Sequence, residues 1–203
     1  MFHQIATAAL SGALALSIAF AGEKPEAEGF VTELVTELRA NAEAEGEGSP
    51  AVRATLEANL ATDAIGRFLL AGSAARNATD EQRSRYEMLF PQYIAAAYAE
   101  EIGQLTSREI RVDDSLERRP GDIIVQSVLI DTQGRERADI DWRVRELDDG
   151  TYKLLDVLVE RTSPLITRRQ AFSSRVRDEG LDGLLTHMEA VIAAGVVVEV
   201  DEE

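Results

Sequence analysis

An unbroken alternation of apolar and charged side chains at residues 139–145 constrains the fold of this chain more than any other feature. Ile140, Trp142 and Val144 fall on one side of this segment, and aspartate and arginine residues fall on the other. Period-two alternation predicts a β-strand with one buried and one solvated face. The sequence Asp-Asp-Gly at residues 148–150 tolerates the positive φ angles of a tight turn, so the chain is expected to fold back as a hairpin.

The return strand is expected to place Leu155, Val157 and Val159 on the same inward face. Pro164 then ends the pairing, because proline has no N–H for a ladder. The residues beyond the proline have helical spacing, namely Leu165, Ile166, Arg169 and Phe172. The hairpin therefore leads directly into a helix that can fold over the sheet.

Two further strands are expected before the hairpin, at residues 109–113 and 123–131, with a turn at 119–122. The second of these carries apolar residues on both faces, including Val125 and Leu129, which predicts a central position in the sheet. Helices are predicted both before and after these strands. The fold class that follows is α+β, with a four-stranded antiparallel sheet packed against a helical layer.

The helical layer is predicted from apolar stripes and capping signals. Residues 30–38 form an amphipathic stripe, and residues 41–50 are expected to form a loop. A second helix is predicted to begin at Pro50, and Asp63 is expected to cap a further turn that contains Phe68.

A long helix is predicted after the capping box formed by Thr79 and Gln82. Pro91 within it predicts a kink, because its ring removes one backbone hydrogen bond. Gly180 is expected to end the helix that contains Phe172, and a last helix is predicted to follow it. One side of the long helix carries the aromatic and aliphatic residues Tyr86, Leu89, Phe90, Tyr93, Ile94 and Tyr98.

The amino terminus has the pattern of an export signal. Residues 1–22 contain no Lys, Arg, Asp or Glu, and Ala-Phe-Ala at residues 19–21 offers the small residues that signal peptidase requires. We therefore expect residues 1–21 to be a signal peptide and residues 22–203 to form a single domain. The net charge of -16 argues against nucleic-acid binding, because such a field repels phosphate backbones.

The sequence offers little for catalysis or metal binding. The chain has no cysteine, and His187 is the one histidine after the predicted cleavage site, so the usual zinc sites are excluded and no cofactor is expected. Asp139 and Asp141 share a strand face with arginines, which is more typical of a solvated surface than of acid–base catalysis.

The hairpin and the helix after it resemble the closing third of the MlaC family, the periplasmic phospholipid carriers also called toluene-tolerance proteins. The matching residues are Tyr152, Lys153, Asp156, Glu160, Ser163, Arg169 and Phe172. Arg161 stands where the family usually has glycine, and Arg168 where it usually has tyrosine. A second stretch is also similar, through Gly72, Arg76, Ala78, Thr79, Gln82 and Tyr86, but Ala75 replaces the usual tryptophan.

The resemblance implies a periplasmic phospholipid carrier, not an enzyme, that moves lipid between inner-membrane and outer-membrane Mla-type complexes, and we expect it to be a monomer. It also implies that acyl chains lie in an apolar cleft between the sheet and the helices. The residues expected to bind lipid are Phe68, Phe90, Tyr93, Ile94, Tyr98, Val125, Leu129, Ile140, Trp142, Val144, Leu155, Val157, Val159, Ile166 and Phe172.

Two other interpretations remain open at the level of sequence. The inward apolar residues are also those of an ordinary closed core, as in a structural or adaptor protein. Alternatively, the chain resembles the cone-shaped α+β enzymes of the ketosteroid isomerase group, with a buried carboxylate such as Asp156 acting on an apolar substrate.

Overall fold

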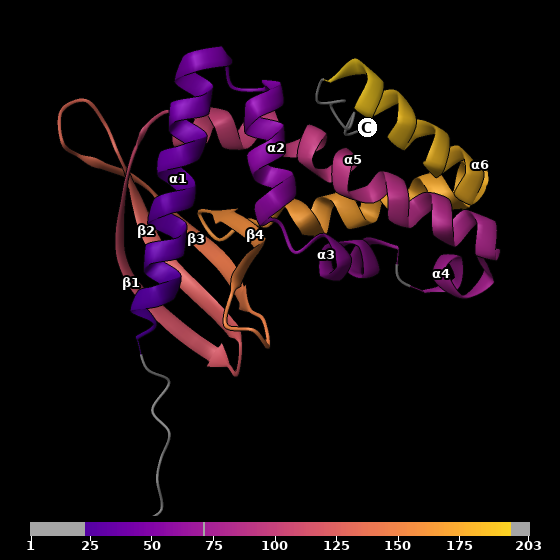
Figure 1. The fold of residues 1–203 in the computed structure, drawn as a ribbon, viewed down its shortest axis with the longest axis horizontal. Helices are drawn as coiled ribbons and strands as arrows, with labels where there is room; N and C mark the ends of the chain where they lie inside the picture. The colour runs from indigo at the N-terminus through magenta and orange to yellow at the C-terminus, as the bar shows by residue number, and fades with distance from the viewer. Residues whose placement is uncertain (1–22, 71, 196–203) are drawn as a thin grey trace, which may run out of the picture.

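A computed structural model describes residues 23–70 and 72–195, and within them the chain forms six helices and one four-stranded sheet (Figure 1). The predicted signal peptide and the acidic carboxyl-terminal residues lie outside these ranges. The elements follow in the order α1 (Pro25–Glu45), α2 (Pro50–Asn59), α3 (Thr62–Leu69), α4 (Ser73–Asn77), α5 (Asp80–Thr106), β1 (Glu109–Arg119), β2 (Asp122–Ile130), β3 (Glu136–Glu146), β4 (Tyr152–Val159) and α6 (Pro164–Ala194).

The sheet is a meander in which each strand pairs antiparallel with the next, in the order β1-β2-β3-β4. The predicted α+β class and the central position of β2 are thereby confirmed. Strand β1 is longer than expected, because a register shift between Val112 and Asp114 leaves Asp113 unpaired and pairing then resumes. Because this extra residue interrupts the period-two alternation of β1, the sequence pattern indicates only the first part of the strand.

Helix α1 lies across one face of the sheet beside β1 and β2 (Figure 1). The side chains between the sheet and the helices are fully buried, with Ile123, Val125, Ile140, Trp142 and Val144 at 0% exposure. They belong to the same apolar cluster as the buried residues of the helices. The central part of the inward face is therefore filled by protein side chains.

Several helix boundaries follow the capping signals of the sequence. Ser49 accepts a hydrogen bond from the backbone N–H of Val52 at 3.3 Å, and Thr79 and Gln82 form the predicted capping box. Gly180, with φ 75° and ψ 177°, interrupts α6 and separates its two helical halves. Such a conformation is open to glycine alone among common residues, so the predicted break is confirmed.

Two predicted features of the helical layer are wrong. Residues 41–45 continue α1 instead of forming a loop, because alanine and glutamate favour helix and Asn41 donates to the hydroxyl of Thr55 at 3.0 Å. Asp63 lies in the first turn of α3 and does not cap it. The backbone N–H of Ala61 instead donates to the carbonyl of Leu154 at 2.8 Å, so a tertiary contact with β4 fixes the start of α3.

Candidate functional site

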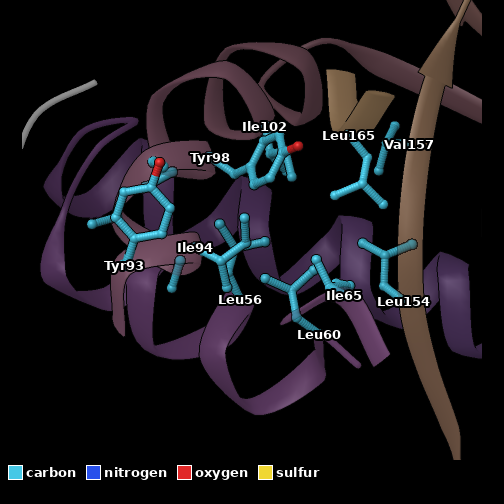
Figure 2. Packing of buried hydrophobic residues seen from close by; sticks show 14 of the residues in the cluster. Leu56, Leu60, Ile65, Tyr93, Ile94, Tyr98, Ile102, Leu154, Val157 and Leu165 are labelled. Carbon is cyan, nitrogen blue, oxygen red and sulfur yellow. The ribbon is translucent and has the colours of Figure 1, made fainter. Parts of the chain in front are cut away.

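An apolar pocket of about 230 Å³ lies where the edge strand β4 meets α3, α5 and the start of α6. Figure 2 shows several of its walls, with Tyr98 and Ile102 facing Leu154, Val157 and Leu165. The remaining apolar walls come from Leu60, Ile65, Leu105, Leu155, Val159 and Pro164. The polar residues of the lining are Glu101, Gln104, Arg108 and Asp156.

A β-bulge in β4 shapes the wall of this pocket. Arg143 pairs with Asp156, whereas the next residue of β3, Val144, pairs with Leu154, so Leu155 is the extra residue. The inward residues of β4 are therefore Leu154 and Val157, which are 1% and 8% exposed. The expectation that Leu155 shares the inward face with Val157 is wrong, because the bulge reverses the alternation between them.

Tyr98 lines the pocket, and its hydroxyl is buried. Its side chain is 7% exposed, and its Oη has no hydrogen-bond partner among the described residues. Figure 2 shows this hydroxyl directed toward Leu165 and Val157. Burial raises the pKa of Tyr98 to about 12, so the hydroxyl stays protonated at neutral pH and can donate a hydrogen bond.

Arg168, from the first half of α6, stacks on the ring of Tyr98. Its guanidinium carbon lies 4.5 Å from the centroid of the Tyr98 ring, a cation–π geometry. Its Nη2 donates to the carbonyl of Ala97 at 3.4 Å, a long hydrogen bond. Its Nε is buried and unpartnered in the described part of the chain, where no carboxylate lies within 4.0 Å of the guanidinium.

Asp156 joins the pocket wall to the start of α6. Its Oδ2 accepts a hydrogen bond of 2.5 Å from the hydroxyl of Ser163, and its Oδ1 accepts one of 3.0 Å from the backbone of Val157. Ser163 in turn caps α6 by accepting from the N–H of Ile166 at 3.3 Å. Burial raises the pKa of Asp156, although these hydrogen bonds oppose the change.

The residues expected to bind lipid are distributed over several environments. Tyr98, Leu155, Val157 and Val159 line the pocket. A second group, all within the buried core and outside the pocket lining, consists of Ile94, Val125, Leu129, Ile140, Trp142 and Val144.

The remaining residues of that set lie apart from the pocket. Tyr93 packs on Phe172 with ring centroids 5.6 Å apart, Phe68 lies beneath the guanidinium of Arg169, and Ile166 is 56% exposed. Phe90 lines a separate hollow of about 670 Å³ together with Ala75, the residue that replaces the usual tryptophan of MlaC proteins.

Six residues that line the pocket are absent from the set that the sequence predicted to bind lipid. They are Leu60, Ile65, Ile102, Leu105, Leu154 and Leu165. Their helical spacing marked several of them as inward-facing. Their convergence on β4 depends on the bulge and on the Ala61–Leu154 hydrogen bond, neither of which leaves a signal in the sequence.

The described residues contain no cluster of three or more His, Asp or Glu side chains arranged to hold a metal ion. His187 packs near Tyr93, with ring centroids 6.2 Å apart, and burial lowers its pKa. In the same ranges, no helix combines the length and the apolar character needed to span a membrane.

Comparison with known proteins agrees with this fold. A structure of a phospholipid-binding protein from Ralstonia solanacearum, solved in complex with a phospholipid, superposes with a TM-score of 0.61 at 17% sequence identity. The match covers 83% of this chain and 98% of that one. The sequence profile of the MlaC protein family matches residues 28–190. The chain therefore belongs to the MlaC family.

Proposed function

We propose that this protein binds phospholipid in the pocket beside β4 and carries it through the periplasm between outer-membrane and inner-membrane Mla-type complexes. Residues 1–21 act as the signal peptide, and the mature domain starts at Gly22 and works as a monomer. Membership of the MlaC family supports this function, as does the similar fold of a protein that was solved with a phospholipid bound.

The apolar lining of the pocket is the observation that carries the proposal. Aliphatic side chains from α3, α5, β4 and α6, together with Leu60 after α2, converge on one hollow at the sheet edge. Burial of an acyl chain there contributes about 0.8 kcal/mol per methylene, so a lipid can bind without a dense set of polar contacts. A pocket of this kind suits a carrier, which has to release its ligand as well as hold it.

The pocket must widen to take two acyl chains. Its volume of about 230 Å³ falls below the roughly 300–1,000 Å³ of pockets for small ligands. Pro164 and Leu165, at the start of α6, form one wall, and Gly180 interrupts the same helix farther along. Displacement of the first half of α6 away from β4 is the movement that opens the pocket.

A pair of tryptophan substitutions tests the location of the lipid. Val157 lines the pocket, whereas Val144 is fully buried in the core two strand positions away from Trp142. Val157→Trp is expected to reduce lipid content with little loss of stability in the delipidated protein, because the new ring occupies the space of an acyl chain. Val144→Trp overpacks the core and should lower the free energy of unfolding by about 1–3 kcal/mol or more. Unchanged lipid content in Val157→Trp would place the lipid elsewhere.

Transport requires a separate measurement. Donor and acceptor vesicles that carry a fluorescent phospholipid are expected to exchange it faster when the protein is present, and Val157→Trp should remove the acceleration. An exchange rate that does not depend on the protein would contradict the carrier function.

The cleavage of the signal peptide is tested separately. The intact mass of the protein recovered from the periplasm should correspond to a chain that starts at Gly22.

The raised pKa of Asp156 in an apolar pocket is the one feature that favours an isomerase-like enzyme as a second candidate. Both oxygens of this carboxylate, however, already accept hydrogen bonds from Val157 and Ser163. Asp156→Asn separates the two functions. A carrier keeps its lipid content in this variant, whereas an enzyme that uses Asp156 as a base loses turnover of a ketosteroid substrate.

A further inference from the structure

Helices α2 and α6 begin with the same Ser-Pro pair, but only one of the two serines also bonds to the sheet. Ser49 and Ser163 each accept a hydrogen bond of 3.3 Å from the backbone N–H three residues farther along. The hydroxyl of Ser163 also donates to Oδ2 of Asp156 in β4 at 2.5 Å, whereas Ser49 caps α2 without a carboxylate partner among the described residues. The start of α6 is therefore tied to β4 by a bond that helix capping does not require.

Asp156 relies on Ser163 as its side-chain donor within the described ranges. Arg143 lies opposite Asp156 across the two strands, but its guanidinium donates to Asp122 at 2.8 and 3.1 Å. The other oxygen of Asp156 accepts from the backbone N–H of Val157. A hydrogen bond to a charged carboxylate is stronger than one between neutral groups, so the contact with Ser163 contributes to the position of α6.

This contact lies where the walls of the pocket have to part. Asp156 lines the pocket on the side of β4, and the two residues that follow Ser163, Pro164 and Leu165, line it on the side of α6. In the part of the chain that the structure describes, no second side-chain hydrogen bond joins β4 to the start of α6. Separation of α6 from β4 must therefore break the bond between Asp156 and Ser163.

The first half of α6 is bounded by backbone conformations outside the helical region. Before it, Glu160 and Arg161 have φ angles of 49° and 64° in a tight turn closed by two backbone hydrogen bonds of 2.9 and 3.2 Å. After it, Gly180 interrupts the helix with φ 75°. The turn holds the chain against β4 as far as Thr162, so Ser163 is the first residue that can move together with the helix.

We propose that Asp156 and Ser163 are positioning residues that form a latch on the lipid pocket, in which their hydrogen bond holds α6 against β4 and slows the release of bound lipid. This inference rests on the proposed function and assigns the contact that sets how long a lipid stays bound. Entry and release pass through the same opening. A weaker latch should therefore accelerate both steps, and the amount of bound lipid should change less than the two rates.

Release of an isotopically labelled phospholipid tests the latch. The protein is loaded with dipalmitoyl phosphatidylethanolamine that has deuterated acyl chains, and it is then mixed with an excess of unlabelled dioleoyl phosphatidylcholine vesicles. Native mass spectrometry follows the loss of the labelled lipid with time. Asp156→Ala and Ser163→Ala should each release it about tenfold faster than the parent protein, since each removes a hydrogen bond to a charged group.

Two further variants separate the bond from its partners. The double variant Asp156→Ala/Ser163→Ala should release lipid no faster than either single variant, because the two side chains act through one bond. Ser163→Thr keeps a hydroxyl at this position and should release lipid more slowly than Ser163→Ala. Ser163 itself lies outside the pocket lining, so Ser163→Ala tests the latch with every lining residue in place, even where Asp156→Ala does not fold.

Ser49→Ala is the matched control. It removes the cap of a helix with the same Ser-Pro start, and Ser49 lies outside the pocket lining. This variant should melt at a lower temperature than the parent protein, as Ser163→Ala should, because both lose a helix cap. It should nevertheless release the labelled lipid at the rate of the parent protein.

Four outcomes have distinct meanings. Release at the parent rate by Ser163→Ala overturns the latch and leaves the carrier function intact. Equal acceleration in Ser49→Ala and Ser163→Ala also overturns it, because the lost cap then accounts for the change. A double variant whose acceleration is the product of those of the two single variants overturns it as well, since the residues then act independently. A parent protein that takes up no labelled lipid overturns the proposed lipid-binding function itself.

Discussion

The indole Nε1 of Trp142 donates a hydrogen bond of 2.9 Å to the hydroxyl of Ser127, and both side chains are buried. Ser127 in turn donates to the backbone carbonyl of Ile140 at 3.1 Å. The pair joins neighbouring strands β2 and β3, in which Ser127 lies opposite Ile140. The single tryptophan of the chain is thus a structural residue of the sheet, outside the pocket lining.

Ser127→Ala should lower the free energy of unfolding by about 1–3 kcal/mol, because the buried indole N–H is left without a partner. Urea unfolding followed by the fluorescence of Trp142 measures this change. Gln126→Ala alters the neighbouring exposed residue on the same strand and should change the stability by less than about 0.5 kcal/mol. Equal stability of Ser127→Ala and the parent protein would mean that water or another group pairs with the indole.

Glycine is required where α5 passes the loop after α1. A Cβ atom on Gly103 would lie 2.3 Å from the carbonyl oxygen of Glu47, so Gly103→Ala forces the backbone of α5 away from the backbone at Glu47. This substitution should lower the free energy of unfolding by about 1–3 kcal/mol or more. Gly29→Ala is the control within a helix, since no atom lies within 4 Å of its Cβ position. It should raise the stability by about 0.5–1 kcal/mol through helix propensity. Chemical denaturation of both variants gives the comparison, and a stabilised Gly103→Ala protein would contradict the close packing.

The turn between β4 and α6 holds two residues in the left-handed region. Glu160 has φ 49° and Arg161 has φ 64°, and the backbone groups of Val159 and Thr162 bond to each other on either side. Arg161→Gly should raise the free energy of unfolding by about 0.5–1 kcal/mol, because glycine adopts this φ without strain. Arg161→Ala removes the guanidinium but keeps the Cβ, so it should not be stabilising. A gain in melting temperature for the alanine variant and not for the glycine variant would locate the effect in the side chain.

Stability at low pH should depend on Asp122. Hydrogen bonds from Arg143, with a smaller contribution from Arg119, lower the pKa of this carboxyl to about 2. Because the folded pKa is depressed, the stabilising contribution of Asp122 is complete above its unfolded value of 3.8 and disappears as the pH falls toward 2. The stability difference between the parent protein and Asp122→Asn should therefore shrink between about pH 4 and pH 2. Arg143→Gln should remove most of that pH dependence, and persistence of the full dependence in Arg143→Gln would assign it to another carboxyl.

The sequence predicts those parts of the fold that depend on local signals. Alternation at Ile140, Trp142 and Val144 defines a strand, the Thr79–Gln82 box starts a helix, and Gly180 interrupts one, because each signal acts within a few residues. The pocket depends instead on tertiary contacts. The bulge at Leu155 decides which residues of β4 face inward, and pairing with β3 creates it.

The same limit applies to the packing of Arg168 on Tyr98. The aromatic stripe of α5 includes Tyr98, and helical spacing predicts that it faces inward, but the position of Arg168 over its ring depends on how α6 packs against α5. Arg168 stands out in the sequence only as a departure from the tyrosine usual in MlaC proteins. The absence of partners for its Nε in the described chain is a property of the folded structure alone.

Native mass spectrometry of the protein purified from the periplasm tests the central claim most directly. We predict a mass that corresponds to the chain starting at Gly22 plus a glycerophospholipid, at about one lipid per chain. Removal of the lipid should lower the melting temperature, and added phospholipid should restore it by mass action. A protein that emerges without lipid, and whose melting temperature does not change when phospholipid is added, would contradict the account.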